Sequence, residues 1–262
     1  MKMHIRLRHI VLLVVVFAIA AVPLAVSATN SWGGYHWART SNPFTLKLGD
    51  NLSSTWDPIL ATTSSDWSQS TVLDTTIVSG QAKGSCSKVT KGRVEVCNKA
   101  YGFNGWLGVA GIWVSGSHIT QGYVKVNDSY FNTATYNTTA WRNLVMCQEV
   151  GHTLGLAHQD EDFNNEPLGT CMDYTSDPTP NQHPNQHDYD QLALIYEHLD
   201  STTTLSATAP GPGASAAAIQ DGEEWGAAVQ ADAHGRPNLF VKDLGGGQKK
   251  FTWVFWTAPG KP

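Results

Sequence analysis

The feature that most constrains this chain is residues 146–158, MCQEVGHTLGLAH, which predicts the end of a helix that closes at a glycine. Gln148 and His152 are four residues apart, so on a helix their side chains share one face. Gly155 can adopt the left-handed conformation that ends a helix and redirects the chain. His158 can therefore return to the same point in space as His152. This spacing indicates a metal site.

Four positions of this segment resemble the metzincin zinc-protease signature, H-E-x-x-H-x-x-G-x-x-H: Glu149, His152, Gly155 and His158. Downstream, residues 171–174 (CMDY) resemble the methionine turn, with Tyr174 two residues after Met172 as in the astacin and serralysin branches. The first histidine of the signature is replaced by Gln148. The chain thus resembles a matrixin-like catalytic domain over roughly residues 32–199, with specific motifs only between Gln148 and Tyr174.

The resemblance implies a zinc ion bound by Gln148, His152 and His158, with one position open for water. An amide oxygen is a poorer zinc donor than imidazole, so we expect zinc to be lost easily to chelators. Two alternatives stand beside this ligand set. Either the third ligand is Asp160 or Asp162, or the site is inactive.

The resemblance also implies roles in catalysis. Glu149 would act as general base towards the metal-activated water, and Tyr174 would stabilise the oxyanion. Met172 would form an apolar floor beneath the metal. The implied function is a secreted zinc-dependent endopeptidase that cleaves an extended peptide or protein substrate. The alternatives are a catalytically inactive scaffold acting as a secreted binding module, and a structural protein that zinc merely stabilises.

Residues 1–28 predict a secretory signal peptide. They contain a basic start, an apolar run over residues 10–26 and the small residues VSA at the cleavage site. An uncleaved membrane anchor is the alternative, because the run approaches spanning length. We expect a secreted, extracellular monomer with no membrane contact after cleavage. The net charge of -5 and the 15% content of charged residues argue against a nucleic-acid partner.

The four cysteines of an exported chain predict disulfides, and three pairings are possible. Cys86 and Cys97 flank a predicted hairpin with Gly92 at its tip, so we expect them to pair. Cys147 and Cys171 would then pair. This pairing agrees with the metzincin arrangement, in which the methionine turn lies beneath the active-site helix. A zinc ion bound by cysteine is the alternative.

The order of predicted elements gives an α+β fold. The resemblance implies a mostly parallel twisted sheet, an active-site helix, a methionine turn and a C-terminal helix. It also implies that an extended substrate adds to the edge of the strand at residues 106–114. A buried core strand is the alternative interpretation of this segment, and the two are compatible. Alternation and helical spacing predict the following elements: strands at 44–48, 72–78, 106–114 and 119–126, a helix at 56–67 capped by Thr55, the metal helix after residues 137–139, and a helix at 188–199.

The domain boundaries follow from composition. Residues 29–200 form the predicted catalytic domain, 201–220 a Ser/Thr/Ala/Pro/Gly linker, and 221–262 a small C-terminal β segment to which we assign no role. The loop at 159–166 is rich in carboxylates and amides, so calcium is possible there, although no specific motif supports it. His36 is interpreted as a structural surface histidine rather than a ligand. His118 is interpreted as a turn histidine, with a metal or substrate contact as the alternative.

Overall fold

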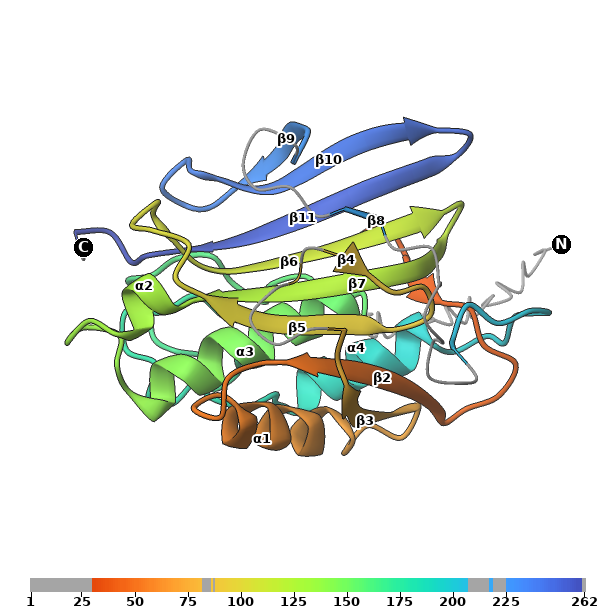
Figure 1. The fold of residues 1–262 in the computed structure, drawn as a ribbon, viewed down its shortest axis with the longest axis horizontal. Coiled ribbons are helices and arrows are strands. Elements are labelled where there is room, and N and C mark those ends of the chain that lie inside the picture. The colour runs from red at the N-terminus through yellow and green to blue at the C-terminus, as the bar shows by residue number, and fades with distance from the viewer. Residues whose placement is uncertain (1–29, 82–85, 87, 207–216, 219–224, 261–262) are drawn as a thin grey trace, which may run out of the picture.

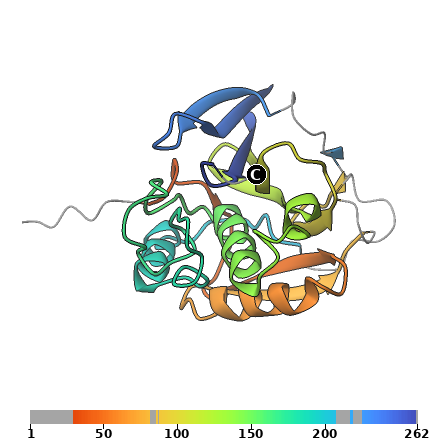
Figure 2. The same ribbon diagram turned by 90° about the vertical axis from the view of Figure 1, so that its left-hand side faces the viewer.

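The structure is a computed structural model that describes residues 30–81, 86, 88–206, 217–218 and 225–260. A nine-stranded mixed sheet forms the body of the molecule. Helices α1 (Asp57–Trp67) and α3 (Thr139–Thr153) lie against one face of this sheet, with α4 (Gln186–Ile195) beside them (Figures 1 and 2). The predicted signal peptide lies outside the described residues. Within them, no helix has the length and apolar character needed to cross a membrane.

The sheet has the order β3-β2-β5-β7-β6-β11-β10-β9, and β1 pairs with β7 off this path. A separate two-stranded sheet pairs β4 with β8. The strand bounds are β1 His36–Trp37, β2 Phe44–Asn51, β3 Leu73–Ser79, β4 Lys88–Val89, β5 Val94–Lys99, β6 Trp106–Ser115, β7 His118–Asn127, β8 Ala217–Ala218, β9 Ala227–Ala231, β10 Pro237–Gly245 and β11 Gln248–Trp256.

The α+β class is confirmed. The sheet is mostly parallel within the predicted catalytic domain, as expected, and the C-terminal strands make the whole sheet mixed. Pairs among β1, β2, β3, β5 and β7 are parallel, whereas β6 pairs antiparallel with both β7 and β11, and β10 pairs antiparallel with β11 and β9. The antiparallel pairing of β6 with β7 and of β10 with β11 follows from the length of the connections between them. A turn of two residues joins β6 to β7 and another joins β10 to β11, and connections that short permit only antiparallel pairing.

The helices begin where polar side chains satisfy free backbone amides. The Thr138 hydroxyl accepts a hydrogen bond from the Trp141 amide at the start of α3, and Asn185 and Asp188 form a capping box at the start of α4. Helix α1 departs from the prediction, because Trp56 rather than Thr55 occupies its N-cap position and makes no side-chain cap. A four-residue helix, α2 (Asp128–Phe131), follows β7.

The predicted hairpin between Cys86 and Cys97 does not form. Strand β4 pairs with β8, and β5 lies between β2 and β7 as a parallel strand. Strand β5 is buried on both faces over Val94–Asn98, and such a strand is more stable inside the sheet than in an isolated hairpin. The disulfide between Cys86 and Cys97 forms nonetheless. The second disulfide joins Cys147 to Cys171, so both predicted pairings are confirmed.

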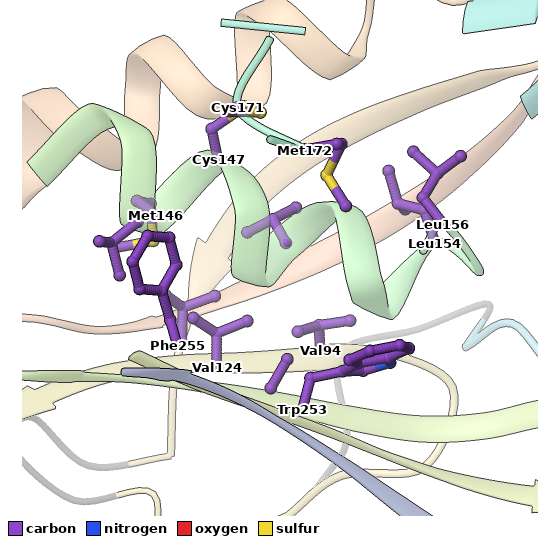
Figure 3. Packing of buried hydrophobic residues seen from close by; sticks show 14 of the residues in the cluster. Val94, Val124, Met146, Cys147, Leu154, Leu156, Cys171, Met172, Trp253 and Phe255 are labelled. Atoms are coloured by element: carbon purple, nitrogen blue, oxygen red, sulfur yellow. A yellow bond between two sulfur atoms is a disulfide. The ribbon is translucent and has the colours of Figure 1, made fainter. Parts of the chain in front are cut away.

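The C-terminal strands extend the main sheet. Strand β11 pairs with β6 from Gln248↔Ser115 to Trp256↔Trp106, and β10 and β9 follow outward. Trp253 and Phe255 join the same hydrophobic core as helix α3. Figure 3 shows this helix between the sheet, which carries Trp253 and Val124, and the segment of Cys171 and Met172.

Candidate functional site

The end of α3 and the turn after it create the candidate site. The helix ends at Thr153, and Gly155 follows with a φ of +100°. A side chain at Gly155 would collide with the carbonyl oxygen of Tyr35, so both the backbone conformation and the space require glycine. This turn returns the chain, and the Nε2 atoms of His152 and His158 lie 2.9 Å apart. The predicted convergence of these two histidines is therefore present.

The outer nitrogens of both rings are held by acceptors. Nδ1 of His152 lies 2.9 Å from the Leu156 carbonyl oxygen, and Nδ1 of His158 lies 2.7 Å from a carboxylate oxygen of Glu161. We assign the ring proton to Nδ1 in each histidine, because neither partner can donate. Two lone pairs on Nε2 then face each other, and this repulsion is relieved by a cation between them.

Protonation is the other way to relieve this repulsion. Burial lowers the pKa of His152 well below its ordinary value, and the proximity of His158 lowers it further. A second proton on the His152 ring is thus disfavoured. Two ligands of a tetrahedral zinc ion lie about 3.3 Å apart, close to the observed separation. Imidazoles whose Nδ1–H is held by a carbonyl or a carboxylate are the usual metal-ligating form. The pair therefore fits a zinc ion.

Gln148 and Glu149 present unpartnered oxygens in the same region. The Gln148 amide nitrogen donates to the Cys171 carbonyl oxygen at 2.6 Å, and its Oε1 is buried without a hydrogen-bond partner among the described residues. Both Glu149 carboxylate oxygens are also buried and lack a well-formed hydrogen bond within the described chain. Burial raises the pKa of Glu149 well above its ordinary value, and the Ala110 backbone amide offsets part of the rise. Buried acceptors of this kind are costly unless a ligand satisfies them.

Met172 packs against α3, and Tyr174 packs against the histidine pair. Met172 packs under α3, where a Cβ added at Gly151 would stand 2.5 Å from its sulfur. The Tyr174 ring lies against His158 at a centroid distance of 4.4 Å, and its hydroxyl donates to the Val254 carbonyl oxygen at 3.3 Å. Burial raises the pKa of Tyr174 well above its ordinary value.

The two carboxylates considered as substitute ligands are used within their own loop. Oδ1 of Asp160 accepts a hydrogen bond from the Asp162 amide at 2.7 Å, and Oδ1 of Asp162 accepts one from the Asn164 amide at 2.9 Å. Asp160 and Asp162 thus stay with the loop and have no described contact with the histidine pair. Cys147 is excluded as a ligand because its sulfur is in the disulfide. Calcium in this loop stays a prediction.

Strand β11 covers the site. The Trp253 ring stacks on His152 at 4.5 Å with an interplanar angle of 10°, and its edge meets His158 at 5.1 Å. Gln148 and Glu149 are 0% exposed, His152 1% and His158 7%. Sequence reasoning did not assign this role to Trp253, which it marked only as part of the aromatic run at 251–256.

The edge of β6 is occupied by the same strand. Trp253 pairs with Ala110 and Phe255 with Gly108, next to the point where Glu149 packs against β6. The edge at residues 106–114, to which an extended substrate is expected to add, is therefore already paired in this structure. An extended segment of the chain itself takes that place.

Comparison with known proteins assigns no family to this chain. No protein-family model matches the sequence, and no curated protein matches it significantly. The functional assignment therefore depends on the geometry of the site.

Proposed function

We propose that this chain is a zinc-dependent endopeptidase of the matrixin-like metzincin kind, kept latent by its own C-terminal strand. One observation carries the proposal. The Nε2 atoms of His152 and His158 face each other, and each ring has its Nδ1 held by an acceptor. Glu149, three residues before His152, has a buried carboxylate that makes no well-formed hydrogen bond within the described chain. A helix, a glycine turn and a following Met-x-Tyr segment support the same assignment.

Zinc would be held by His152, His158 and the amide oxygen of Gln148. It would polarise the scissile carbonyl and lower the pKa of a bound water. The hydrogen bond from the Gln148 amide nitrogen to the Cys171 carbonyl leaves only Oε1 free for this purpose. The disulfide between Cys171 and Cys147 braces that carbonyl.

The chain's own residues would carry the proton transfers. Glu149 would accept a proton from the attacking water and deliver it to the leaving amine, and its free oxygens support this role. Tyr174 would donate to the carbonyl oxygen of the substrate. Its hydroxyl already donates to the Val254 carbonyl of an extended strand, which is the geometry such a substrate would require.

Latency follows from the position of β11. The strand pairs along the whole of β6, and Trp253 lies on the histidine pair, so water and substrate have no path to Glu149 in this conformation. We infer that activity requires the C-terminal hairpin, β10 and β11, to move away from β6. The predicted secretion signal and the two disulfides support an extracellular setting for this step.

A second candidate function is a secreted binding module on an inactive scaffold. Gln148 in place of histidine and the complete burial of Glu149 favour it. This function needs no proton transfer, so Glu149 would be dispensable. The two candidates thus differ in a measurable way.

The test uses zinc-loaded, tag-free mature protein and a reduced, alkylated generic protein as substrate. Four proteins are compared: the wild type, Trp253→Ala, Glu149→Ala and the double variant, with zinc content measured in each. We expect Trp253→Ala to cleave and the double variant not to cleave. Absence of cleavage by zinc-bound Trp253→Ala would favour the binding module. A wild type as fast as Trp253→Ala would show that β11 imposes no latency.

A further inference from the structure

A second cluster of metal-binding side chains lies away from the candidate active site. His36 is in β1 and His118 begins β7, and the two strands pair in register at these residues. His198 and Asp200 follow helix α4. Three segments that are distant in sequence thus bring three imidazoles and one carboxylate together.

The polar atoms of this cluster converge. Oδ1 of Asp200 lies 3.1 Å from Nε2 of His118, 3.5 Å from Nε2 of His36 and 3.8 Å from Nε2 of His198. The His198 and His36 Nε2 atoms are 3.3 Å apart. Ligands bound at 2.0–2.1 Å in a zinc tetrahedron are separated by about 3.3 Å. The observed separations are of this size.

The buried members are already oriented for a metal. Nδ1 of His36 lies 2.8 Å from the Gly34 carbonyl oxygen and must donate to it, so its Nε2 carries a lone pair. This lone pair faces the cluster. Oδ2 of Asp200 accepts from the Arg39 backbone amide at 3.1 Å and from its guanidinium at 2.9 Å. Oδ1 is left for the cluster. Hydrogen bonds of this kind, which hold a ligand side chain in one orientation, are typical of metal sites.

Hydrogen bonds account for part of this arrangement, because Nε2 of His198 can donate to the lone pair of His36. They leave Asp200 with a single oxygen, Oδ1, shared among three imidazoles. A divalent cation bound by Nε2 of His36, Nε2 of His198 and Oδ1 of Asp200 satisfies these three atoms at once, since such atoms of the three residues all lie within 4.8 Å of one another. The His118 and His198 side chains are 34% and 57% exposed, so an ion can enter from solvent.

We propose that His36, His198 and Asp200 bind a structural divalent transition-metal ion, with zinc as the best fit, and that His118 contacts the ligand Asp200. Two imidazole nitrogens beside one carboxylate oxygen favour zinc over calcium or magnesium, which prefer oxygen. This site is independent of the proposed protease function.

The site would stabilise the frame that holds α3. Trp37, next to His36, donates its indole N–H to the Thr153 carbonyl oxygen at the end of α3, at 2.9 Å. The Trp37 amide donates to the Tyr196 hydroxyl beyond α4, at 3.3 Å. Binding of an ion between β1 and the segment after α4 would lock these contacts. Its effect should appear in stability and metal content.

The test separates this site from the first one. A full-length, tag-free His152→Ala/His158→Ala variant lacks both imidazoles of the candidate active site. We expect it to bind one Co²⁺ with the strong visible absorption of tetrahedral coordination, to retain one Zn²⁺, and to melt at a higher temperature with zinc than with chelator. Adding His198→Ala should weaken metal binding at least tenfold, since loss of even a hydrogen-bond partner that orients a ligand lowers metal affinity 10–100-fold.

The matched control adds His183→Ala instead. His183 is also exposed and also pairs with a carboxylate, Asp66, at 2.7 Å, but it lies outside the cluster. Equal metal binding by the His198 and His183 variants, or no cobalt binding by the His152→Ala/His158→Ala variant, would overturn the proposal. Should that variant fail to fold, metal content is compared between wild type and His198→Ala. A loss of one ion supports the site, and an unchanged content refutes it.

Discussion

Replacing Trp253 by alanine should release the C-terminal hairpin from the candidate site. The Trp253 side chain is 2% exposed and stacks on His152, with its edge towards His158. It also meets Trp32 at a centroid distance of 5.9 Å. All of these contacts join β11 to parts of the chain outside the C-terminal strands, so they are lost when the hairpin opens.

The magnitude follows from the size and burial of this ring. Truncation of a buried Trp to Ala typically costs about 3–5 kcal/mol. If the lower value applies to local opening, the open population rises roughly 10²-fold, because each 1.4 kcal/mol is about a factor of ten. Hydrolysis by an enzyme that acts only when open should rise by a similar factor.

The assay measures cleavage of an internally quenched peptide by zinc-loaded protein, together with hydrogen exchange of the β11 amides. Trp256→Ala is the matched control, because Trp256 is in the same strand but packs with Trp225 on the opposite face and is only partly buried. It should change the rate roughly tenfold or less, since less apolar area is lost.

Two results would refute the reasoning. Faster exchange in β11 of Trp253→Ala without any gain in cleavage would mean that an open site is not a working one. Equal gains for Trp253→Ala and Trp256→Ala would mean that loosening the strand matters and contact with the histidines does not.

Three further predictions test the frame of the site. Gly155→Ala should destabilise the fold by about 3 kcal/mol or more in urea unfolding, because φ is +100° and the added Cβ would collide with the Tyr35 carbonyl oxygen. Gly169→Ala is the control: its φ is +71° with open space around it, so it should cost only about 1–2 kcal/mol. Equal costs for the two variants would contradict this reasoning. Loss of the Cys147–Cys171 bridge, which spans 24 residues, should cost about 3 kcal/mol of unfolding free energy, and an unchanged midpoint would argue against that estimate. Burial and the nearby Asp66 and Asp188 raise the pKa of Tyr189 from 10.0 to about 12, so its contribution to stability is present below pH 10 and is lost as the pH rises towards 12. Tyr189→Phe should flatten the stability profile over that interval, and identical profiles would rule out this linkage.

The sequence alone was sufficient for features that depend on near neighbours. Three such features act over a few residues of the chain and are present in the structure: the Thr138 cap, the spacing of Gln148 and His152, and the turn at Gly155. The same holds for most strand and helix positions. Thr55 is an exception, because a favourable cap residue competes with the packing of Trp56 against α2 and α3.

Only the tertiary structure decided how distant segments meet. Strand β11 could have paired with several edges or formed its own sheet, and its aromatic pattern predicts burial without naming the partner. Trp253 lies on His152 because β6 offers an edge beside α3. His36, His118 and Asp200 likewise converge only through the pairing of β1 with β7 and the path of the chain after α4. Local propensity acts within a turn or two of the chain, whereas contacts between remote segments depend on which edges and faces the whole fold leaves open.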